Sequence, residues 1–368
     1  MDRSEYLALL RETSEKVYPL MWKQVEGIRQ IDAELYDAVM FLVSRKLAKP
    51  SLKATLFRLS YEACGGEDWE NTIPGAAAFE FLNISSYQAN AAFDTKLGVL
   101  SRSEKDSQFM AAMITREIAF HAASRLGERW GEQIAVEVQA ALSKSNRCIY
   151  VAQHYDLNLL NVRNLERYRE ELLFNQHYVE RCRYGSGVFT AECARMGGLL
   201  AGAHADWLSA LGGFGEEFGT ALQMVNDIGD FVPPDRGLKV ARDFQELGSD
   251  VRNGRLTAPL YYLLNSSTSC LVEEVTHLAE AQTLSPEQIT QVVALAPRTS
   301  AFARAKKMAK SHLRRAKASL HELPPSHARD LLAVMASQVR SNKYFGTLRS
   351  GLSDVQPDME SQCQANKR

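Results

Sequence analysis

Apolar residues recur at every third or fourth position through most of the chain. Ile134, Val138 and Leu142 form one such series, and Leu165 and Tyr168 belong to the next. This spacing places apolar side chains along one side of an α-helix, whereas a strand would need alternation at every second position, which is almost absent. The pattern therefore predicts an all-α protein.

Glycine and proline interrupt this pattern at only a few points. They cluster at Gly65–Gly66, at Pro233–Pro234 and at Pro324–Pro325, with long uninterrupted segments between them. Several helices should therefore exceed about twenty residues. The end from Ser353 to Arg368 is polar and contains too little apolar surface to pack, so we expect a flexible tail.

Composition and charge exclude several classes of protein. Lys and Arg number 43 against 44 Asp and Glu, so the net charge of -1 gives no general attraction to nucleic acid or to an anionic membrane. No apolar stretch is long enough for a transmembrane segment. The six cysteines show no C-x-x-C pair, and the N-terminus has acidic residues where a signal peptide would be cationic and apolar. We expect a cytoplasmic protein with free thiols.

The segment from Phe218 to Phe231 carries the strongest chemical signal. Asn226 and Asp230 are four positions apart, so they share one face of the predicted helix, with Asp227 beside them and Gln223 one turn earlier. They interrupt an otherwise apolar helix. A carboxylate on such a surface is costly unless a metal or a charged ligand compensates it. The pattern favours a site for a hard cation or a diphosphate over a solvated helix end.

This segment and four others together resemble the polyprenyl synthetase family, the trans-isoprenyl diphosphate synthases. Phe218–Asp230 follows the pattern F-G-x-x-x-Q-x-x-D-D-x-x-D, with Asn226 in place of the first aspartate. Asp250–Pro259 follows D-x-x-x-G-K-x-T-x-P, with Arg255 in place of the lysine. The other three segments, in the family's order, are Lys46–Pro50, Glu80–Asp94 and Gln153–Leu157.

The resemblance covers about residues 40 to 345 and implies a domain organisation. It implies the isoprenoid synthase fold, a single large helical bundle around a deep apolar cavity, over residues 41–345. Residues 1–40 are then an N-terminal helical extension, and residues 346–368 are the polar tail. The family resemblance also suggests a homodimer, or a heteromer with an active synthase.

The family's chemistry, as the resemblance implies it, is alkyl transfer from a prenyl diphosphate. Mg²⁺ held by two aspartate-rich motifs helps an allylic diphosphate to ionise, and the carbocation adds to the double bond of isopentenyl diphosphate. Carried over, the catalytic residues are Asn90, Asp94, Asn226, Asp227 and Asp230. The metal ligands are Asn90, Asp94, Asp156, Asn226, Asp230 and Asp250. Asparagine replaces the leading aspartate of both motifs and contributes no charge, so we expect weak metal binding or fewer ions than usual.

The resemblance also assigns the residues that hold the two diphosphates and the prenyl chain. The diphosphate-binding residues are Lys46, Lys49, Asn83, Lys96, Gln153, Gln223, Lys239 and Arg255. An Arg-Arg pair of the family is missing after the first motif. The depth of the chain pocket in this family depends on residues just upstream of that motif, here the small residues Ser85 and Ser86. They predict an open shaft that accepts a C15 or C20 chain.

Four functions fit this pattern of retained and lost residues. The favoured one is a divergent prenyltransferase that acts on an allylic prenyl diphosphate, with a non-standard acceptor or reduced metal dependence. The alternatives are an unmodified synthase, a catalytically impaired regulatory or structural subunit of a synthase, and a terpene cyclase of the same fold. A cyclase would carry N-D-x-x-S-x-x-x-E, and this chain has Asp230 and Pro234 at the Ser and Glu positions.

Overall fold

The computed structural model describes residues 3–93, 100–232, 247–266, 273, 275–277, 284–296 and 299–341. Within these ranges the regular elements are helices, and β-pairing is confined to one isolated bridge between Asn161 and Arg255. The prediction of an all-α protein is therefore confirmed. Several helices also exceed twenty residues, as the spacing of glycine and proline predicts.

The described elements follow one another along the chain in the order below. The first half contains α1 (Arg3–Arg29), α2 (Ala33–Leu47), α3 (Leu52–Ala63), η1 (Trp69–Thr72), α4 (Ile73–Phe93), α5 (Arg102–Ser124), α6 (Gly127–Trp130), α7 (Glu132–His154), η2 (Tyr155–Leu159) and η3 (Val162–Tyr168). The second half contains α8 (Glu171–Cys182), η4 (Arg183–Gly187), α9 (Val188–Leu200), α10 (Ala205–Gly229), α11 (Ser249–Arg252), α12 (Ala258–Asn265), α14 (Pro286–Leu295), α15 (Ala301–Ser319), η6 (Leu320–Glu322) and α16 (His327–Ser341).

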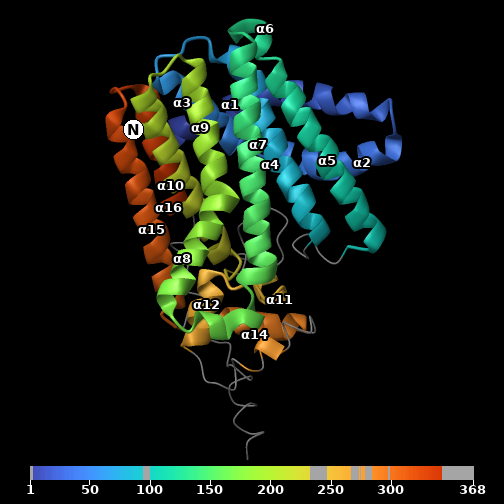
Figure 1. Cartoon of the computed structure of the whole chain (residues 1–368), viewed down its shortest axis with the longest axis vertical. Helices are drawn as coiled ribbons and strands as arrows, with labels where there is room; N and C mark the ends of the chain where they lie inside the picture. Colours follow the sequence, from blue (N-terminus) through green and yellow to red (C-terminus); the bar gives the residue numbers. More distant parts are fainter. Residues whose placement is uncertain are drawn as a thin grey trace, which may run out of the picture.

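The long helices form a bundle in which each packs on neighbours distant in sequence (Figure 1). Helix α10 packs against α9 and α15, α3 packs against α9, and α4 packs along α5. Helix α1 contacts α2, α3, α4 and α16, so the N-terminal segment shares this packing. The division at residue 40 stays a prediction, and the tail from residue 346 lies outside the described residues.

Several helices begin at residues whose side chains satisfy the first backbone amides. Asp32 accepts a hydrogen bond from the amide of Leu35 at 2.8 Å at the start of α2. At α5, Ser101 and Glu104 form a reciprocal capping box. Such caps satisfy amide groups that have no partner inside the helix, so they fix where each helix begins.

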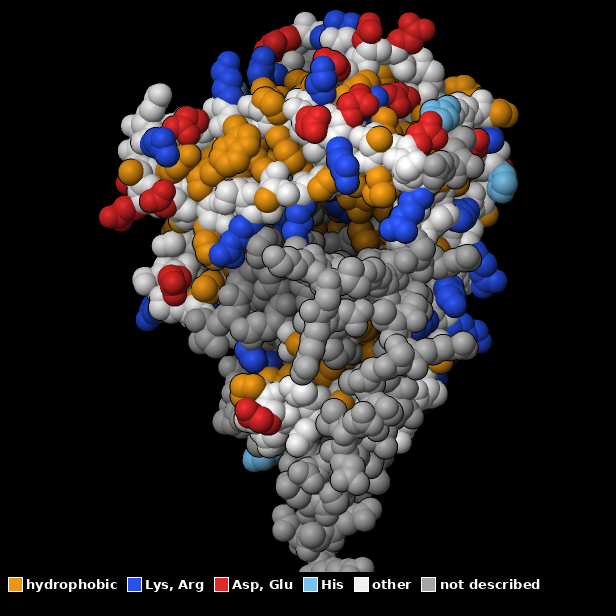
Figure 2. Space-filling model, turned by 180° about the vertical axis from the view of Figure 1, so that it is seen from behind, with side chains coloured by type: hydrophobic (Ala, Val, Ile, Leu, Met, Phe, Trp, Pro, Cys, Tyr) orange, Lys and Arg blue, Asp and Glu red, His pale blue; other side chains and the backbone are white. Residues whose placement is uncertain are grey.

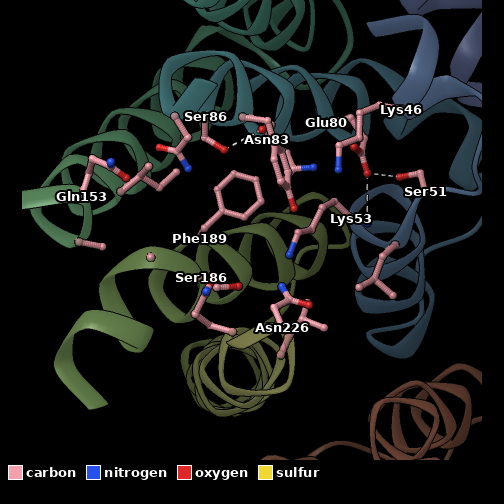
Figure 3. Close-up of a pocket in the computed structure, with 18 of the residues that line it drawn as sticks. Lys46, Ser51, Lys53, Glu80, Asn83, Ser86, Gln153, Ser186, Phe189 and Asn226 are labelled. Atoms are coloured by element: carbon pink, nitrogen blue, oxygen red, sulfur yellow. Dashed lines mark hydrogen bonds between the residues drawn. The ribbon is translucent and has the colours of Figure 1, made fainter. Parts of the chain in front are cut away.

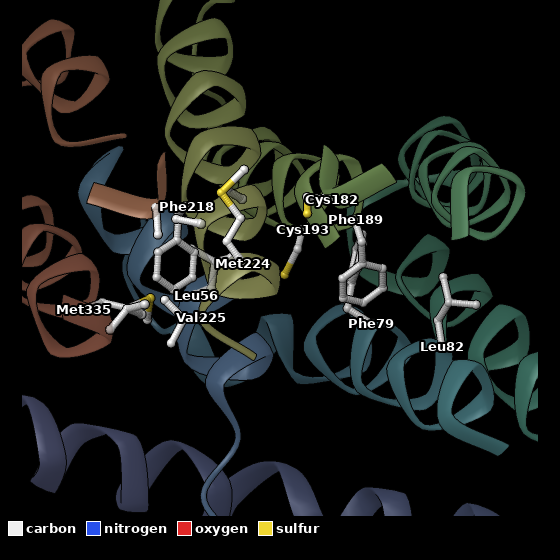
Figure 4. Packing of buried hydrophobic residues seen from close by; sticks show 14 of the residues in the cluster. Leu56, Phe79, Leu82, Cys182, Phe189, Cys193, Phe218, Met224, Val225 and Met335 are labelled. Carbon is white, nitrogen blue, oxygen red and sulfur yellow. The ribbon is translucent and has the colours of Figure 1, made fainter. Parts of the chain in front are cut away.

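The core is a continuous apolar cluster between the central helices (Figure 4). Phe79 of α4 lies between two other rings, with centroid distances of 5.8 Å to Phe57 of α3 and 5.7 Å to Phe189 of α9. Tilted or edge-on ring pairs at such distances are favourable. These contacts connect three helices that also carry residues of the candidate site.

Helices α9 and α10 approach closely because glycine occupies one side of the contact. A Cβ atom at Gly215 would lie 2.4 Å from the backbone oxygen of Thr190, and one at Gly219 would lie 1.9 Å from the Thr190 hydroxyl. Any larger residue would push the two helices apart. This close packing brings Ser186 of η4 next to the C-terminal half of α10, where the polar motif lies.

None of the helices in the described part of the chain is both long enough and apolar enough to cross a membrane.

Candidate functional site

A cavity of about 280 Å³ lies where α4, α7, α9 and α10 face the loop between α2 and α3 (Figure 3). The polar side chains that line it include Lys46, Lys49, Lys53, Glu80, Asn83, Ser86, Asn90, Gln153, Asp156, Arg181, Gln223, Asn226 and Arg255. Leu47, Leu52, Ile149, Phe189 and Leu222 supply apolar surface. The cavity therefore combines many hydrogen-bonding groups with an apolar wall.

The lining of this cavity is strongly cationic. Of the described residues that line it, five are lysine or arginine and two are glutamate or aspartate. Lysine and arginine side chains also gather around a hollow on the face shown in Figure 2. Such a concentration of positive charge attracts an anionic ligand, since a concave low-dielectric site strengthens the field. A ligand with several negative charges fits this arrangement best.

The loop that carries Lys49 is held in place from two sides. The hydroxyl of Tyr18, on α1, donates to the backbone oxygen of Lys49. The amide of Ser51 donates to the hydroxyl of Ser14 at 2.7 Å, and the Ser51 hydroxyl donates to Glu80. These contacts hold the backbone from Lys49 to Ser51, so α1 helps to shape the cavity.

Lys53 is the most unusual cation of the site. It lies on the first turn of α3, it is 7% exposed, and its amino group lies 5.2 Å from the centroid of the Phe189 ring. Figure 3 shows its side chain directed toward Asn226 and Phe189. Burial lowers the pKa of Lys53 from 10.5 to about 8; Cys193 and Glu80 oppose this shift, and Lys46 adds to it. The amine still carries its charge at neutral pH and would gain from a nearby anion.

Two short π-helical turns shape the opposite wall. One is η2, which follows α7 directly and contains Asp156, and the other is η4, which follows α8 and contains Ser186. A π turn inserts an extra residue into the helix and changes the direction in which side chains point, and such turns are frequent at functional sites. Here they bring Asp156 and Ser186 to the cavity wall.

Gln153, at the end of α7, offers an unused donor to the cavity. Its side chain is buried and lines the cavity, and its amide nitrogen has no hydrogen-bond partner among the described residues. A buried donor without an acceptor is unfavourable by about 1–3 kcal/mol. An acceptor oxygen of a ligand would remove this penalty.

Arg181 binds two buried aspartates at the base of the cavity. Its Nε and Nη2 donate to the two oxygens of Asp156 at 2.7 and 2.9 Å, and its Nη1 donates to Oδ2 of Asp227 at 2.8 Å. The hydroxyl of Tyr178 donates to the same Asp227 oxygen at 2.8 Å, and Gln223 donates to Oδ1 at 3.0 Å. Burial alone would lower the pKa of Arg181, but the two carboxylates outweigh it and raise this pKa above its ordinary range.

Asp230 and Asp250 lie beside the cavity and organise the turn that begins α11. Asp230 accepts the amide and hydroxyl of Ser249 at 3.1 and 2.9 Å and the amide of Asp250 at 2.8 Å. Nη1 of Arg255 lies 3.9 Å from Oδ1 of Asp250. The backbone amide of Arg255 donates to the backbone oxygen of Asp250 at 2.8 Å. Asp230 therefore holds the segment that places Arg255 at the cavity.

Most of the residues predicted from the sequence meet at this one cavity. Those that line it are Lys46, Lys49, Asn83, Ser86, Asn90, Gln153, Asp156, Gln223, Asn226 and Arg255. Asp227, Asp230 and Asp250 lie behind its wall. Ser85 faces the other way, because its hydroxyl donates to the backbone oxygen of Ala112 on α5 at 2.8 Å. Asp94, Lys96 and Lys239 lie outside the described residues.

Lys53, Arg181 and Phe189 line the cavity and were not among the residues predicted from the sequence. Lys53 carries a charge inside the apolar start of α3, which is the signal that could have identified it, whereas Arg181 lies between Glu180 and Arg183 and gives no such signal. Phe189 gives no signal either, because aromatic residues are common in helix cores. Its ring comes from α9, packs on Phe79 and lines the cavity together with Ser86, and the open shaft beyond the small serines stays a prediction.

The polyprenyl synthetase family profile matches residues 101–296, which is more than half of the chain. The chain belongs to the polyprenyl synthetase family. The prenyl transferase of Cyanophora paradoxa is 25% identical over 186 residues, which cover 50% of this chain and 53% of that protein. Component 2 of the heptaprenyl diphosphate synthase of Bacillus subtilis is 25% identical over 167 residues, 45% of each chain. The matches thus span about half the length of these relatives.

The fold of this family member extends over nearly the whole chain. The crystal structure of geranylgeranyl pyrophosphate synthetase from Pyrococcus horikoshii superposes with a TM-score of 0.73 at 18% sequence identity. The match covers 92% of this chain and 99% of that chain. This confirms the prediction of the isoprenoid synthase fold.

Magnesium, which the family resemblance implied, does not fit Asp156, Asp227 and Asp230, and Oδ1 of Asp250 faces Nη1 of Arg255 at 3.9 Å. Both oxygens of Asp156 accept hydrogen bonds from Arg181. The two oxygens of Asp227 accept hydrogen bonds from Tyr178 and Gln223. Both oxygens of Asp230 accept hydrogen bonds from the turn at Ser249 and Asp250. No group of three acidic, histidine or cysteine side chains converges within the described ranges. Mg²⁺ needs several oxygen ligands in near-octahedral geometry. Of the lining residues, Asn90 and Asn226 offer only neutral amides.

Proposed function

We propose that this chain is a divergent prenyltransferase that acts on an allylic prenyl diphosphate in the cavity between α4, α7, α9 and α10. The observation that carries the proposal is the convergence of Lys46, Asn83, Gln153 and Asn226 at this cavity. They come from four separate parts of the sequence. A purely structural role would not need cations and amides to gather around one concave site.

The cavity suits a diphosphate attached to a hydrocarbon chain. Lys46, Lys49 and Lys53 supply compact positive charges at one side, and Gln153 supplies a buried amide donor at the other. The apolar wall around Phe189 suits the prenyl part. Phosphate oxygens bind lysine strongly because the hydrogen bonds are charge-assisted.

Alkyl transfer in such a site begins when the bond between the allylic carbon and the diphosphate oxygen breaks. The electron pair leaves with the oxygen, and the carbocation is attacked by the π electrons of the acceptor, which then loses a proton. The fixed cations of the cavity stabilise the charge that develops on the leaving group. Phe189 and Leu222 keep water from the cation, which would otherwise give an alcohol.

The proposal includes an assembly of more than one chain. A homodimer is expected from the family resemblance, and the heptaprenyl diphosphate synthase relative is a component of its enzyme, which supports a heteromer as the second arrangement. Light scattering on the purified protein distinguishes a monomer from a dimer. Co-purification with an active synthase tests the heteromer.

The proposal is tested by incubating the purified protein with C5, C10, C15 and C20 diphosphates, each with and without isopentenyl diphosphate. Released pyrophosphate and mass spectra of the extracted products are the readouts. We expect release from at least one allylic substrate, lost in Lys46→Met and retained in Lys310→Met, an exposed lysine outside this cavity. Release that requires an added active synthase would favour the subunit alternative. No release under any of these conditions would contradict a prenyltransferase.

A further inference from the structure

The contacts of Arg181 differ from those of an ordinary surface ion pair. Its side chain is 4% exposed, and those of Asp156 and Asp227 are 10% and 2% exposed. The guanidinium meets Asp156 with two parallel hydrogen bonds, which is the strongest geometry for this pair of groups. Buried aspartates are costly without a cation, and here the chain itself supplies one.

In this arrangement every carboxylate oxygen of Asp156 and Asp227 already accepts at least one hydrogen bond from the chain itself. A divalent ion bound to this pair would lie beside the guanidinium of Arg181 or would have to displace it from Asp156. In either arrangement two cations would be buried together. Repulsion between them would oppose metal binding, because unit charges a few ångströms apart interact strongly in a low-dielectric interior.

The remainder of the cavity carries the positive charge that a diphosphate needs. The lining cations outnumber the lining anions by three. Lys53 adds an ammonium group that is nearly buried and makes neither an ion pair nor a hydrogen bond through Nζ with any described residue. The buried amide of Gln153 likewise lacks an acceptor within the part of the chain that the structure describes. Two separate groups thus point to one anionic ligand.

We propose that Arg181 is a fixed cation at the Asp156–Asp227 pair, in place of a divalent metal ion, and that the cavity binds a diphosphate group through its lysines without such an ion. The inference rests on the proposed function for the identity of the ligand. Arg181 acts as a positioning residue, since its bonds go to the two aspartates. Lys53 is a binding residue that none of the family patterns in the sequence includes.

Calorimetric titration of the purified protein with sodium pyrophosphate tests this directly, once in EDTA and once in MgCl2. We expect binding in both solutions, with dissociation constants within about threefold, which is less than 1 kcal/mol. Lys53→Met should weaken binding in EDTA at least about tenfold, and Lys310→Met should not change it. Binding only in MgCl2 would overturn the inference and leave the proposed function intact. No binding in either solution would overturn both.

The melting temperature of Arg181→Met gives an independent readout. Loss of the guanidinium leaves two buried aspartates without a cation, so the variant should melt lower in EDTA and recover several degrees in MgCl2. The wild type and Arg183→Met, which removes a partly exposed ion pair with Glu216 of α10, should not respond to MgCl2. An equal response of the wild type would refute the proposal. If Arg181→Met does not fold, the pyrophosphate titration of the wild type decides alone.

Discussion

Lys53 offers the sharpest prediction, because the group that should bind the ligand should also destabilise the empty protein. Its pKa falls from 10.5 to about 8, mainly through burial. A difference of one pKa unit corresponds to about 1.4 kcal/mol, so holding this lysine protonated in the fold costs about 3 kcal/mol at neutral pH. The cation–π contact with Phe189, 5.2 Å from Nζ to the ring centroid, offsets up to about 1 kcal/mol of this cost.

Lys53→Met keeps the shape of the side chain and removes its charge. We therefore expect the variant to be more stable than the wild type by about 2 kcal/mol at pH 7, measured by urea denaturation without ligand. Between pH 8 and 10.5 the unfolded wild type binds more protons at this residue than the folded protein does. The stability of the wild type should therefore rise relative to the variant across this range, and the advantage of the variant should shrink.

The control is Lys310→Met, which removes an exposed lysine of α15 and should change stability by less than about 0.5 kcal/mol. A Lys53→Met protein that is less stable than the wild type at pH 7 would refute the reasoning. It would mean that the ammonium group is well compensated inside the fold. A stability difference that does not depend on pH would also refute it.

The remaining predictions concern the wall of the cavity and its supports. Phe189→Ala should deepen the cavity and favour longer prenyl diphosphates, measured as a larger gain in affinity for C20 than for C10 diphosphate; equal changes would show that the chain does not reach this ring. Gly219→Ala should lower the free energy of unfolding by about 2 kcal/mol, because the new Cβ would lie 1.9 Å from the Thr190 hydroxyl, and an unchanged urea midpoint would contradict this close contact. Asp227→Ala should cost about 3 kcal/mol, because it removes the acceptor that Arg181 shares with Tyr178, and a loss below about 1 kcal/mol would show that this pair is not important for stability.

The helical architecture could be predicted from sequence because it depends on local periodicity. A helix of more than twenty residues repeats its apolar spacing several times, and the capping residues mark its ends. The positions of Lys46, Asn83, Gln153 and Asn226 at one cavity were also predicted. That prediction came from the resemblance to a family pattern, because the spacing within one helix does not indicate which distant helix lies opposite.

The role of Arg181 could not be predicted in the same way. Its partners lie 25 and 46 positions away in sequence. The segment Arg181-Cys182-Arg183 contains two arginines. Arg181 is buried with the aspartates, whereas Arg183 pairs with Glu216 nearer the surface. The direction of the helix as it enters the π turn η4 decides which arginine takes which place. Asp156 and Asp227 therefore gave a signal for metal binding in the sequence, whereas in the structure their oxygens accept hydrogen bonds from a side chain.

The central claim is that an allylic prenyl diphosphate binds in this cavity, and a crystal structure with an unreactive analogue, farnesyl thiodiphosphate, tests it most directly. The account predicts the diphosphate between Lys46, Lys49, Lys53 and Gln153, with the chain against Phe189. The second cationic cavity, lined by Lys306, Lys307, Lys310, Arg314 and Lys317 on α15, serves as an internal comparison. An analogue bound there while the first cavity remains empty at saturating concentration would contradict the account.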